Sequence, residues 1–329
     1  MSSDVELVRI VRGDRIESVH RGAAAICTPS GEVVEAWGDP AAIVYPRSSC
    51  KMIQALPLLE SGAGAALTDA QLALACASHQ GAAIHTDAVD GWLRAMDMTE
   101  ADLRCGAHRP YAEEAADALV RAGAAPCQLH NNCSGKHAGF LTLGRHLKAG
   151  PDYVEVDHPV QRAVRAAFEE VTAMESPGWG IDGCAAPNFA TRLDALAAAM
   201  ARFAAADGSD GRGRAMVRLR VAMTAHPLLV AGAGRACTDL MTAMDGVAVK
   251  TGAEGVFVAI LPARRLGVAV KIWDGATRAA EAVIAALLVR LGALDGDASV
   301  ARRLTHGPIL NRRGWATGHL EVRLDGSDR

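Results

Sequence analysis

The chain has 329 residues, of which 50% are hydrophobic and 22% are charged. This composition is typical of a folded protein with a sizeable core and excludes an intrinsically disordered chain. The 34 Lys and Arg residues against 37 Asp and Glu residues leave a net charge of −3 with no basic block, which argues against nucleic acid as a partner.

The N-terminal part of the chain predicts short strands. Residues 5–12, 23–28 and 33–37 are runs rich in Val, Ile and Ala, and the turn sequence PSG at 29–31 joins the last two. Such runs separated by turn residues are typical of β-hairpins. We therefore expect an early antiparallel hairpin.

The middle of the chain predicts helices, because its apolar residues recur every three or four positions. Thr68 followed by Gln71 matches the capping-box pattern, and Thr86 or Asp87 is a natural N-cap for the next helix. A glycine-rich turn is expected over 207–213. The predicted helices cover 49–61, 68–77, 86–96, 112–122, 159–175 and 193–206.

The last third of the chain predicts strands again, followed by one amphipathic helix. The predicted strands cover 247–250, 255–262 and 266–273, with a weaker strand-like tail at 308–323, and the helix covers 277–292. Each strand run is rich in Val, Ile and Phe and is bounded by turn residues.

These elements predict an α/β fold, with a mixed or antiparallel sheet built from both ends of the chain and helices on its faces. A large helical lobe is inserted between the two parts of the sheet. We expect a single catalytic unit, with a sheet lobe at about 1–48 and 242–329 and a helical lobe at about 49–241. No internal repeat or low-complexity linker interrupts the sequence.

The lack of a secretory signal and the shortness of the apolar runs predict a cytoplasmic protein that does not enter a membrane. The first residues lack the basic and then apolar run of a secretory signal. The apolar run at 282–288 is too short to cross a bilayer of about 30 Å. The eight scattered cysteines are expected to be reduced rather than to form a disulfide framework.

Ser48 and Lys51 form an SxxK pattern where strand character gives way to helix. A serine at a helix start lies beside the positive end of the helix dipole, and a lysine three residues later lies on the same face. Such a lysine can take the serine's proton only when neutral, which requires a pKa lowered by burial or by nearby positive charge. The alternative is that Ser48 or Ser49 is only an N-cap and Lys51 is a solvated side chain.

Lys250-Thr251-Gly252 lies at the end of a predicted strand that precedes another strand and a helix. An SxxK pattern at a helix start combined with KTG on a late strand is typical of β-lactamases and penicillin-binding proteins. Gly252 permits close backbone approach, and the Lys250 ammonium could keep Lys51 deprotonated. The SDN motif of those enzymes is absent from this sequence, which argues against direct membership of that group.

Five further segments carry a closer resemblance. They read ESVHRG from residue 17, RSSCK from 47, SHQG from 78, HNNCSGKHAG from 130 and DGC from 182. Together they resemble the rhizobial-type L-asparaginases, the asparaginase II family, over about residues 5–325. The resemblance implies a fold like those of serine β-lactamases and glutaminases, a homodimer, and hydrolysis of L-asparagine to aspartate and ammonia.

The resemblance also implies two serine–lysine pairs in one site. Ser48 would pair with Lys51, and Ser78 with a lysine of the C-terminal strands, either Lys250 or, as the alternative, Lys271. In the mechanism we expect, Ser48 Oγ attacks the side-chain amide carbon, neutral Lys51 is the base, and the Ser48 backbone N–H is one oxyanion donor. Ser78 and the second lysine would relay protons, although the sequence leaves open which serine attacks.

A zinc ion is a further implication of the resemblance, with Cys133, Lys136 and Cys184 as ligands, water completing the tetrahedron and Asp182 as an acceptor behind the ligands. The spacing of these residues indicates a metal only weakly, because a lysine must lose its proton before it binds a cation. Without the resemblance, both cysteines would be interpreted as core residues. The ion is expected to position the substrate or a lid rather than to activate water.

Several other polar residues lie inside these motifs. His79, His130 and His137 could each bind a substrate carboxylate or another ligand, and a structural role is equally open for each of them. Arg47 could hold the loop or contact the α-carboxylate of the substrate through two hydrogen bonds. Cys50 is expected to pack away from Ser48.

Three other functions fit parts of the pattern. A glutaminase or a β-lactam-recognising serine hydrolase would have the same architecture. A non-catalytic, zinc-stabilised binding protein would keep the fold and the metal without turnover. A cysteine hydrolase with Cys133 as nucleophile is the third, and the intact set of serines and lysines favours the serine hydrolases.

Overall fold

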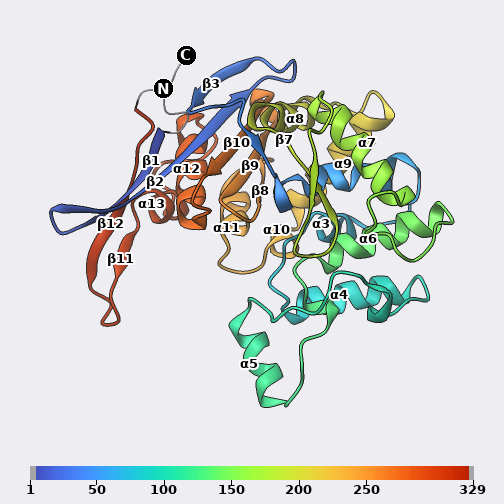
Figure 1. Ribbon diagram of the computed structural model, residues 1–329. Helices are drawn as coiled ribbons and strands as arrows, with labels where there is room; N and C mark the ends of the chain where they lie inside the picture. The colour runs from blue at the N-terminus through green and yellow to red at the C-terminus, as the bar shows by residue number, and fades with distance from the viewer. Residues whose placement is uncertain (1–4, 326–329) are drawn as a thin grey trace.

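An antiparallel sheet of eight strands organises the fold in the computed structural model, which describes residues 5–325 (Figure 1). The strand order is β11-β12-β1-β2-β10-β9-β8, and β3 pairs with β2. The strands are β1 (Val5–Arg12), β2 (Arg15–Cys27), β3 (Val33–Trp37), β8 (Ala248–Thr251), β9 (Val256–Leu261), β10 (Leu266–Ile272), β11 (Pro308–Leu310) and β12 (Ala316–Val322). Because β1 pairs with β12 and β2 with β10, both ends of the chain build one sheet, which confirms the predicted fold class.

Helices cover both faces of this sheet. Every residue of β9 is buried, so neither face is open to solvent there. The alanine-rich α8 (Leu193–Ala205) packs on β2, β9 and β10, while α12 (Thr277–Arg290) packs on β1, β9 and β10, with α13 (Ser299–His306) beside it. Gly267 of β10 is required at the α8 contact, because a Cβ there would overlap the backbone of Ala197 and Ala201.

The segment between β3 and β8 is mainly helical. Besides α8, its helices are η1 (Arg47–Cys50), α1 (Lys51–Gln54), α2 (Leu56–Glu60), α3 (Asp69–Ala75), α4 (Ala83–Arg94), η2 (Glu100–Asp102), α5 (Glu113–Arg121), η3 (Gln128–His130), α6 (Ser134–His146), α7 (Pro159–Thr172), α9 (Gly211–Ala225), α10 (Pro227–Val230) and α11 (Ala236–Ala243). Two small sheets, β4 (Ile43–Val44) with β7 (Thr191–Arg192) and β5 (Trp179–Ile181) with β6 (Pro187–Phe189), lie in the same segment. In Figure 1, α5 projects from the rest of this helical part.

The predicted helix boundaries are correct in some places and wrong in others. Thr68 and Gln71 form the expected capping box at the start of α3. The predicted N-cap at Thr86 or Asp87 is wrong, because α4 begins earlier, at Ala83, and the Thr86 hydroxyl donates to the Ala83 carbonyl within the helix.

Two other differences concern helix continuity. The predicted helix at 49–61 is divided into η1, α1 and α2, with Pro57 in the first turn of the last piece. The expected glycine-rich turn at 207–213 ends earlier, because the Asp210 carboxylate accepts a hydrogen bond from the Gly213 N–H at 2.6 Å and starts α9.

All eight cysteines are free thiols, as expected. Within residues 5–325, no helix is long and apolar enough to span a bilayer.

Candidate active site

The turn that carries Ser48 is held tightly between two parts of the fold. Arg47, the first residue of η1, has φ 53°, a left-handed conformation that costs of order 1–3 kcal/mol for a residue other than glycine. Ser49 closes the turn, because its hydroxyl donates to the Pro46 carbonyl at 2.7 Å. On the other side, a Cβ at Gly252 would lie 2.6 Å from the same carbonyl oxygen. The KTG glycine therefore lets the β8–β9 turn approach the Ser48 turn, and Ser48 itself caps no helix.

Lys51 is fully buried, which excludes the alternative of a solvated side chain. Its Nζ lies 3.1 Å from Ser78 Oγ and 3.1 Å from Cys133 Sγ, and it also donates to the Ala77 carbonyl. No hydrogen bond joins Lys51 to Ser48 Oγ in the described part of the chain. Among the described residues, Lys51 therefore forms a hydrogen bond with the second serine, Ser78, and none with the serine three residues before it.

Lys250 reaches Ser78 from the opposite side. It lies on β8, is 1% exposed, and its Nζ is 2.8 Å from Ser78 Oγ and 2.8 Å from the Thr251 carbonyl oxygen. Burial, followed by the charge of Lys51, lowers the pKa of Lys250 to about 7. Lys271, the alternative, donates to the backbone carbonyl of Glu254 instead, so the geometry favours Lys250.

The Ser78 hydroxyl thus lies between two amines with different hydrogen-bonding needs. Lys51 has three acceptors, which matches the three N–H bonds of an ammonium. Lys250 has the Thr251 carbonyl as acceptor and, with its lowered pKa, can be a neutral amine that accepts the Ser78 proton. A base on one side and a cation on the other is an arrangement that activates a hydroxyl as a nucleophile.

Both serines open onto one cleft of about 380 Å³. Ser78 follows α3, and its backbone N–H donates to the Val230 carbonyl at 2.8 Å, so its position depends on α10. The lining residues come from segments far apart in the sequence and are Ser48, Ser78, Tyr111, Asn132, Arg235, Thr251, Gly252, Ala253, Glu254, Gly275 and Thr277.

Cys133, Lys136 and Cys184 also come together. Cys133 directly precedes α6 and Lys136 lies in its first turn, while Cys184 lies in the turn between β5 and β6. All three side chains are buried, and Lys136 Nζ is 3.0 Å from Cys184 Sγ. The hydrogen bond from Cys133 and the charge of Lys136 hold the pKa of the Cys184 thiol well below its usual value, against the effect of burial. The same hydrogen bond, with burial, raises the pKa of Cys133 to about 12.

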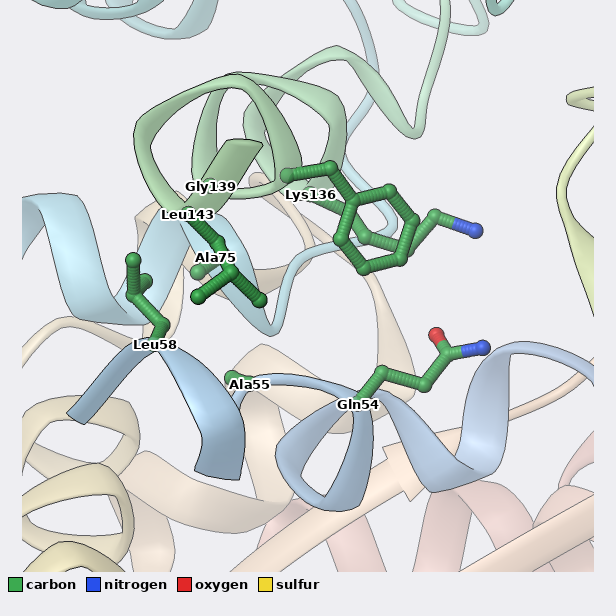
Figure 2. A pocket seen from close by; sticks show the side chains of 8 residues that line it. Gln54, Ala55, Leu58, Ala75, Lys136, Gly139 and Leu143 are labelled. Atoms are coloured by element: carbon green, nitrogen blue, oxygen red, sulfur yellow. The ribbon is translucent and has the colours of Figure 1, made fainter. Parts of the chain in front are cut away.

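This donor set is compatible with the implied metal. Two sulfurs and one amine converge, and deprotonation of Cys133 and Lys136 would turn their contacts with Cys184 into a three-donor site. Across residues 5–325, no group of three or more His, Cys, Asp or Glu side chains could hold a metal ion, so lysine would have to be the third ligand. Figure 2 shows Lys136 of α6 opposite Gln54 of α1, around a void of about 10 Å³.

Asp182 lies beside this group and binds Arg47. Arg47 Nε and Nη2 donate to Asp182 Oδ1 at 3.0 and 2.8 Å, and the Gly183 N–H donates to the same oxygen at 2.8 Å. Burial opposes ionisation of Asp182, but Lys136 and Arg47 hold the pKa of its carboxyl below the usual value. Of the two roles considered for Arg47, the geometry supports the one that holds the loop.

His79 makes protein contacts through both ring nitrogens. Its Nδ1 accepts the Gly81 N–H at 3.1 Å, and its Nε2 lies 2.9 Å from Ser134 Oγ, which donates to the Leu129 carbonyl. Burial lowers the pKa of His79 well below its usual value, so the ring is neutral. These contacts tie the segment after Ser78 to the start of α6.

His137 lies on α6, and Tyr153 OH is 2.9 Å from its Nδ1. Tyr153 OH also accepts the Arg104 N–H at 2.8 Å. The other ring nitrogen of His137, Nε2, has no hydrogen-bond partner among the described residues. His130 Nδ1 accepts the Cys127 N–H at 3.1 Å. Arg47, His79 and His137 are absent from the lining of the cleft that the described residues form.

The sequence interpretation missed four polar side chains that line the cleft: Tyr111, Asn132, Arg235 and Glu254. Asn132 lies inside the HNNCSGKHAG segment, and Glu254 lies two residues after Lys250-Thr251-Gly252, so proximity to those motifs could have indicated them. Arg235 and Tyr111 lie in turns with no motif around them. Only the packing of α11 and of the loop before α5 brings these two to the serines.

Comparison with solved structures finds distant likenesses. A β-lactamase from Mycobacterium bovis is 14% identical and has a TM-score of 0.44, with 82% of this chain and 94% of that chain covered. Mglu in its native form is 16% identical with a TM-score of 0.45, covering 84% of this chain and 66% of Mglu. An octameric penicillin-binding protein homologue from Pyrococcus abyssi is 12% identical with a TM-score of 0.37, covering 84% and 74%. No curated protein sequence matches the chain.

The sequence profile of the L-asparaginase II family matches residues 8–322, nearly the whole chain. This match identifies the protein as an enzyme of the amidohydrolase class. The protein belongs to the L-asparaginase II family, and the resemblance seen in its motifs is confirmed.

Proposed function

We propose that this protein hydrolyses the side-chain amide of L-asparagine to give L-aspartate and ammonia. Membership of the family supports an amidohydrolase. The observation that carries the proposal is the Ser78 hydroxyl, which lies within hydrogen-bond distance of both Lys51 and Lys250 at the wall of an open cleft.

In the proposed mechanism the activated serine attacks the amide carbon and its proton passes to a neutral lysine. The hydrogen bonds favour Ser78 as this serine and Lys250 as the base, with the Lys51 ammonium stabilising the alkoxide. The C–N bond then breaks, the nitrogen takes the proton, and ammonia leaves. Water attacks the resulting ester while Lys250 takes a proton from it. The ester C–O bond then breaks, Ser78 Oγ takes this proton back from Lys250, and L-aspartate is released.

The sequence favours Ser48 as the nucleophile, and Ser48 lies on the same cleft. Its hydroxyl has no lysine as a hydrogen-bond partner in the described part of the chain, which supports a different role. In our proposal its backbone N–H is an oxyanion donor and its hydroxyl contacts the amide. Both serines therefore remain part of the proposed machinery.

The substrate is tested by ammonia release from purified protein. We expect kcat/KM to be higher for L-asparagine than for L-glutamine, and no hydrolysis of a chromogenic β-lactam. A preference for L-glutamine, or β-lactam hydrolysis, would assign the site to one of the other serine hydrolases. Tight metal retention without turnover of any amide would instead favour the non-catalytic binding protein.

We further propose that Cys133, Lys136 and Cys184 hold a zinc ion, which would position the substrate or a lid, because two thiolates would leave the site with little net charge. Support comes from the convergence of the three buried donors and from Asp182, whose carboxylate faces Lys136 and binds Arg47. Arg47 directly precedes Ser48, so occupancy of this group would affect the position of that serine. The homodimer implied by the resemblance and the cytoplasmic location indicated by the N-terminal sequence also remain predictions.

Zinc content provides a direct test of this part. Protein purified without chelator is expected to carry about one zinc ion per chain, and Cys184→Ala should lose most of it, because only three protein ligands are available. Elemental analysis of both proteins measures this, with Cys27→Ala as the control, since Cys27 is an equally buried thiol within β2. Wild-type protein without zinc would contradict the proposal, and so would full retention by the Cys184 variant.

A further inference from the structure

We propose that Arg235 binds the α-carboxylate of the substrate and that Glu254 binds its α-ammonium group, so that the cleft selects a free amino acid. This inference rests on the proposed function and specifies how the same site recognises its substrate. Both side chains line the cleft together with Ser48 and Ser78. Asparagine carries one carboxylate and one ammonium group besides its amide. The Arg235 guanidinium and the Glu254 carboxylate match these two charges, and both lie in the same cleft as the two serines.

Arg235 is a cation held at the cleft without a bonded partner. It directly precedes α11 and is half-buried, yet among residues 5–325 its side chain forms no hydrogen bond or ion pair. Glu281 of α12 interacts with it electrostatically but does not form an ion pair. A guanidinium with free N–H groups can bind a carboxylate through two parallel hydrogen bonds.

The surrounding charges favour an anionic ligand at Arg235. Lys51 and Lys250 lie on either side of Ser78, and Arg235 is close enough to Lys250 to interact with it electrostatically. Lys51 and Arg235 are therefore cations near the reactive hydroxyl, and Lys250 adds a third positive charge whenever it is protonated. A bound carboxylate would offset their mutual repulsion and would hold the substrate beside Ser78.

Glu254 occupies a position where the backbone disfavours its residue type. It lies in the turn between β8 and β9 with φ 58°, a left-handed conformation usually taken by glycine or asparagine in such turns. Its side chain is 69% exposed, and its only ion pair is a long contact of 4.0 Å to Arg47 Nη1, among the residues that the structure describes. A carboxylate in a strained turn, directed to a cleft and weakly paired, is suited to bind a ligand cation.

Arg47 is a poorer candidate for the carboxylate. Its Nε and Nη2 already donate to Asp182, and it does not line the cleft. Binding the substrate through Arg47 would break these contacts, whereas Arg235 has no contact to lose. The α-carboxylate is therefore assigned to Arg235.

Three substrates separate the two contacts. L-asparagine has both charged α-groups, succinamate lacks the ammonium, and β-alaninamide lacks the α-carboxylate. Ammonia release gives kcat/KM for each, and an analogue that is not turned over is measured through its Ki against L-asparagine. The variants are Arg235→Gln and Glu254→Gln. Arg303→Gln is the control, because Arg303 pairs with Asp239 of α11 and also faces Glu281, but lies outside the cleft.

Arg235→Gln is expected to lower kcat/KM for L-asparagine and succinamate, or to raise the Ki of an analogue that is not turned over, by at least about 30-fold, as for a lost hydrogen-bonded charge pair. The value for β-alaninamide should change by less than about threefold. Glu254→Gln should lower kcat/KM, or raise Ki, for L-asparagine and β-alaninamide and should leave the value for succinamate unchanged. The control should leave all three values unchanged. Equal losses on all three substrates in the Arg235 variant would indicate a purely structural role and would overturn the assignment of Arg235 to the α-carboxylate. Equal losses in the Glu254 variant would overturn the assignment of Glu254 to the α-ammonium group.

Failure of the proposed function gives a different result. If wild-type protein releases no ammonia from any of these amides, the hydrolysis proposal fails. Calorimetric titration of wild-type protein and Arg235→Gln with L-aspartate then tests the binding inference by itself. Binding by the wild type that is lost in the variant supports it, and equal binding or none by either protein overturns it.

Discussion

Ser78→Ala is expected to lower kcat/KM for L-asparagine by at least about 10³-fold, the scale on which loss of a nucleophile acts. Ser78 Oγ is the hydroxyl that lies 2.8 Å from Lys250 Nζ and 3.1 Å from Lys51 Nζ, so its removal leaves neither amine a hydroxyl to activate. The fold should survive, because the backbone N–H of Ser78 keeps its hydrogen bond to the Val230 carbonyl. Ammonia release and thermal unfolding measure the two effects.

Ser48→Ala is the matched comparison. It removes a hydroxyl from the same cleft and disrupts no cap, so we expect a smaller loss than for Ser78→Ala. Rapid quenching of the reaction followed by peptide mass spectrometry would locate the acyl group. An acyl group on Ser48, with full turnover by the Ser78 variant, would assign the attack to Ser48 as the sequence first suggested.

The second large effect is expected at Lys250. Lys250→Met should lower kcat/KM by about 10²–10⁴-fold, the usual contribution of a general base. In wild-type protein kcat/KM should rise with pH and level off, with a half-point near 7, because burial and then the charge of Lys51 lower the pKa of Lys250 to about 7. The sign follows from the base being the neutral amine, which is present above this pKa and absent below it.

Lys271→Met is the control for this prediction, because Lys271 was the alternative second lysine and donates to the Glu254 carbonyl instead. We expect it to keep the rise near pH 7. A profile that stays flat in folded wild-type protein would exclude Lys250 as the base. Loss of activity in Lys271→Met but not in Lys250→Met would assign the role of the base to Lys271.

The sequence predicted those elements whose signals are local. The strands β1, β3, β9 and β10 were found from their Val and Ile runs, and the start of α3 from its capping box. By contrast, α6 was missed as a helix, because nearly all of its residues are buried and its sequence has no polar face that alternates with an apolar one. The helix α9 was missed because two glycines in its first turn suggested a loop.

For the site, the sequence by itself determined which residue types are present and in which motifs: two serines, Lys51, Lys250 with its neighbouring Gly252, and the two cysteines with Lys136. Only the tertiary structure decided their partners. Lys51 contacts Ser78 rather than Ser48, and Arg47 turns to Asp182, leaving Arg235 at the cleft. The physical reason is that these contacts join residues 27 to 172 positions apart, so they depend on how α3, α6 and β8 pack. The lowered pKa of Lys250 has the same origin, because only the folded chain buries this side chain and brings the charge of Lys51 close to it.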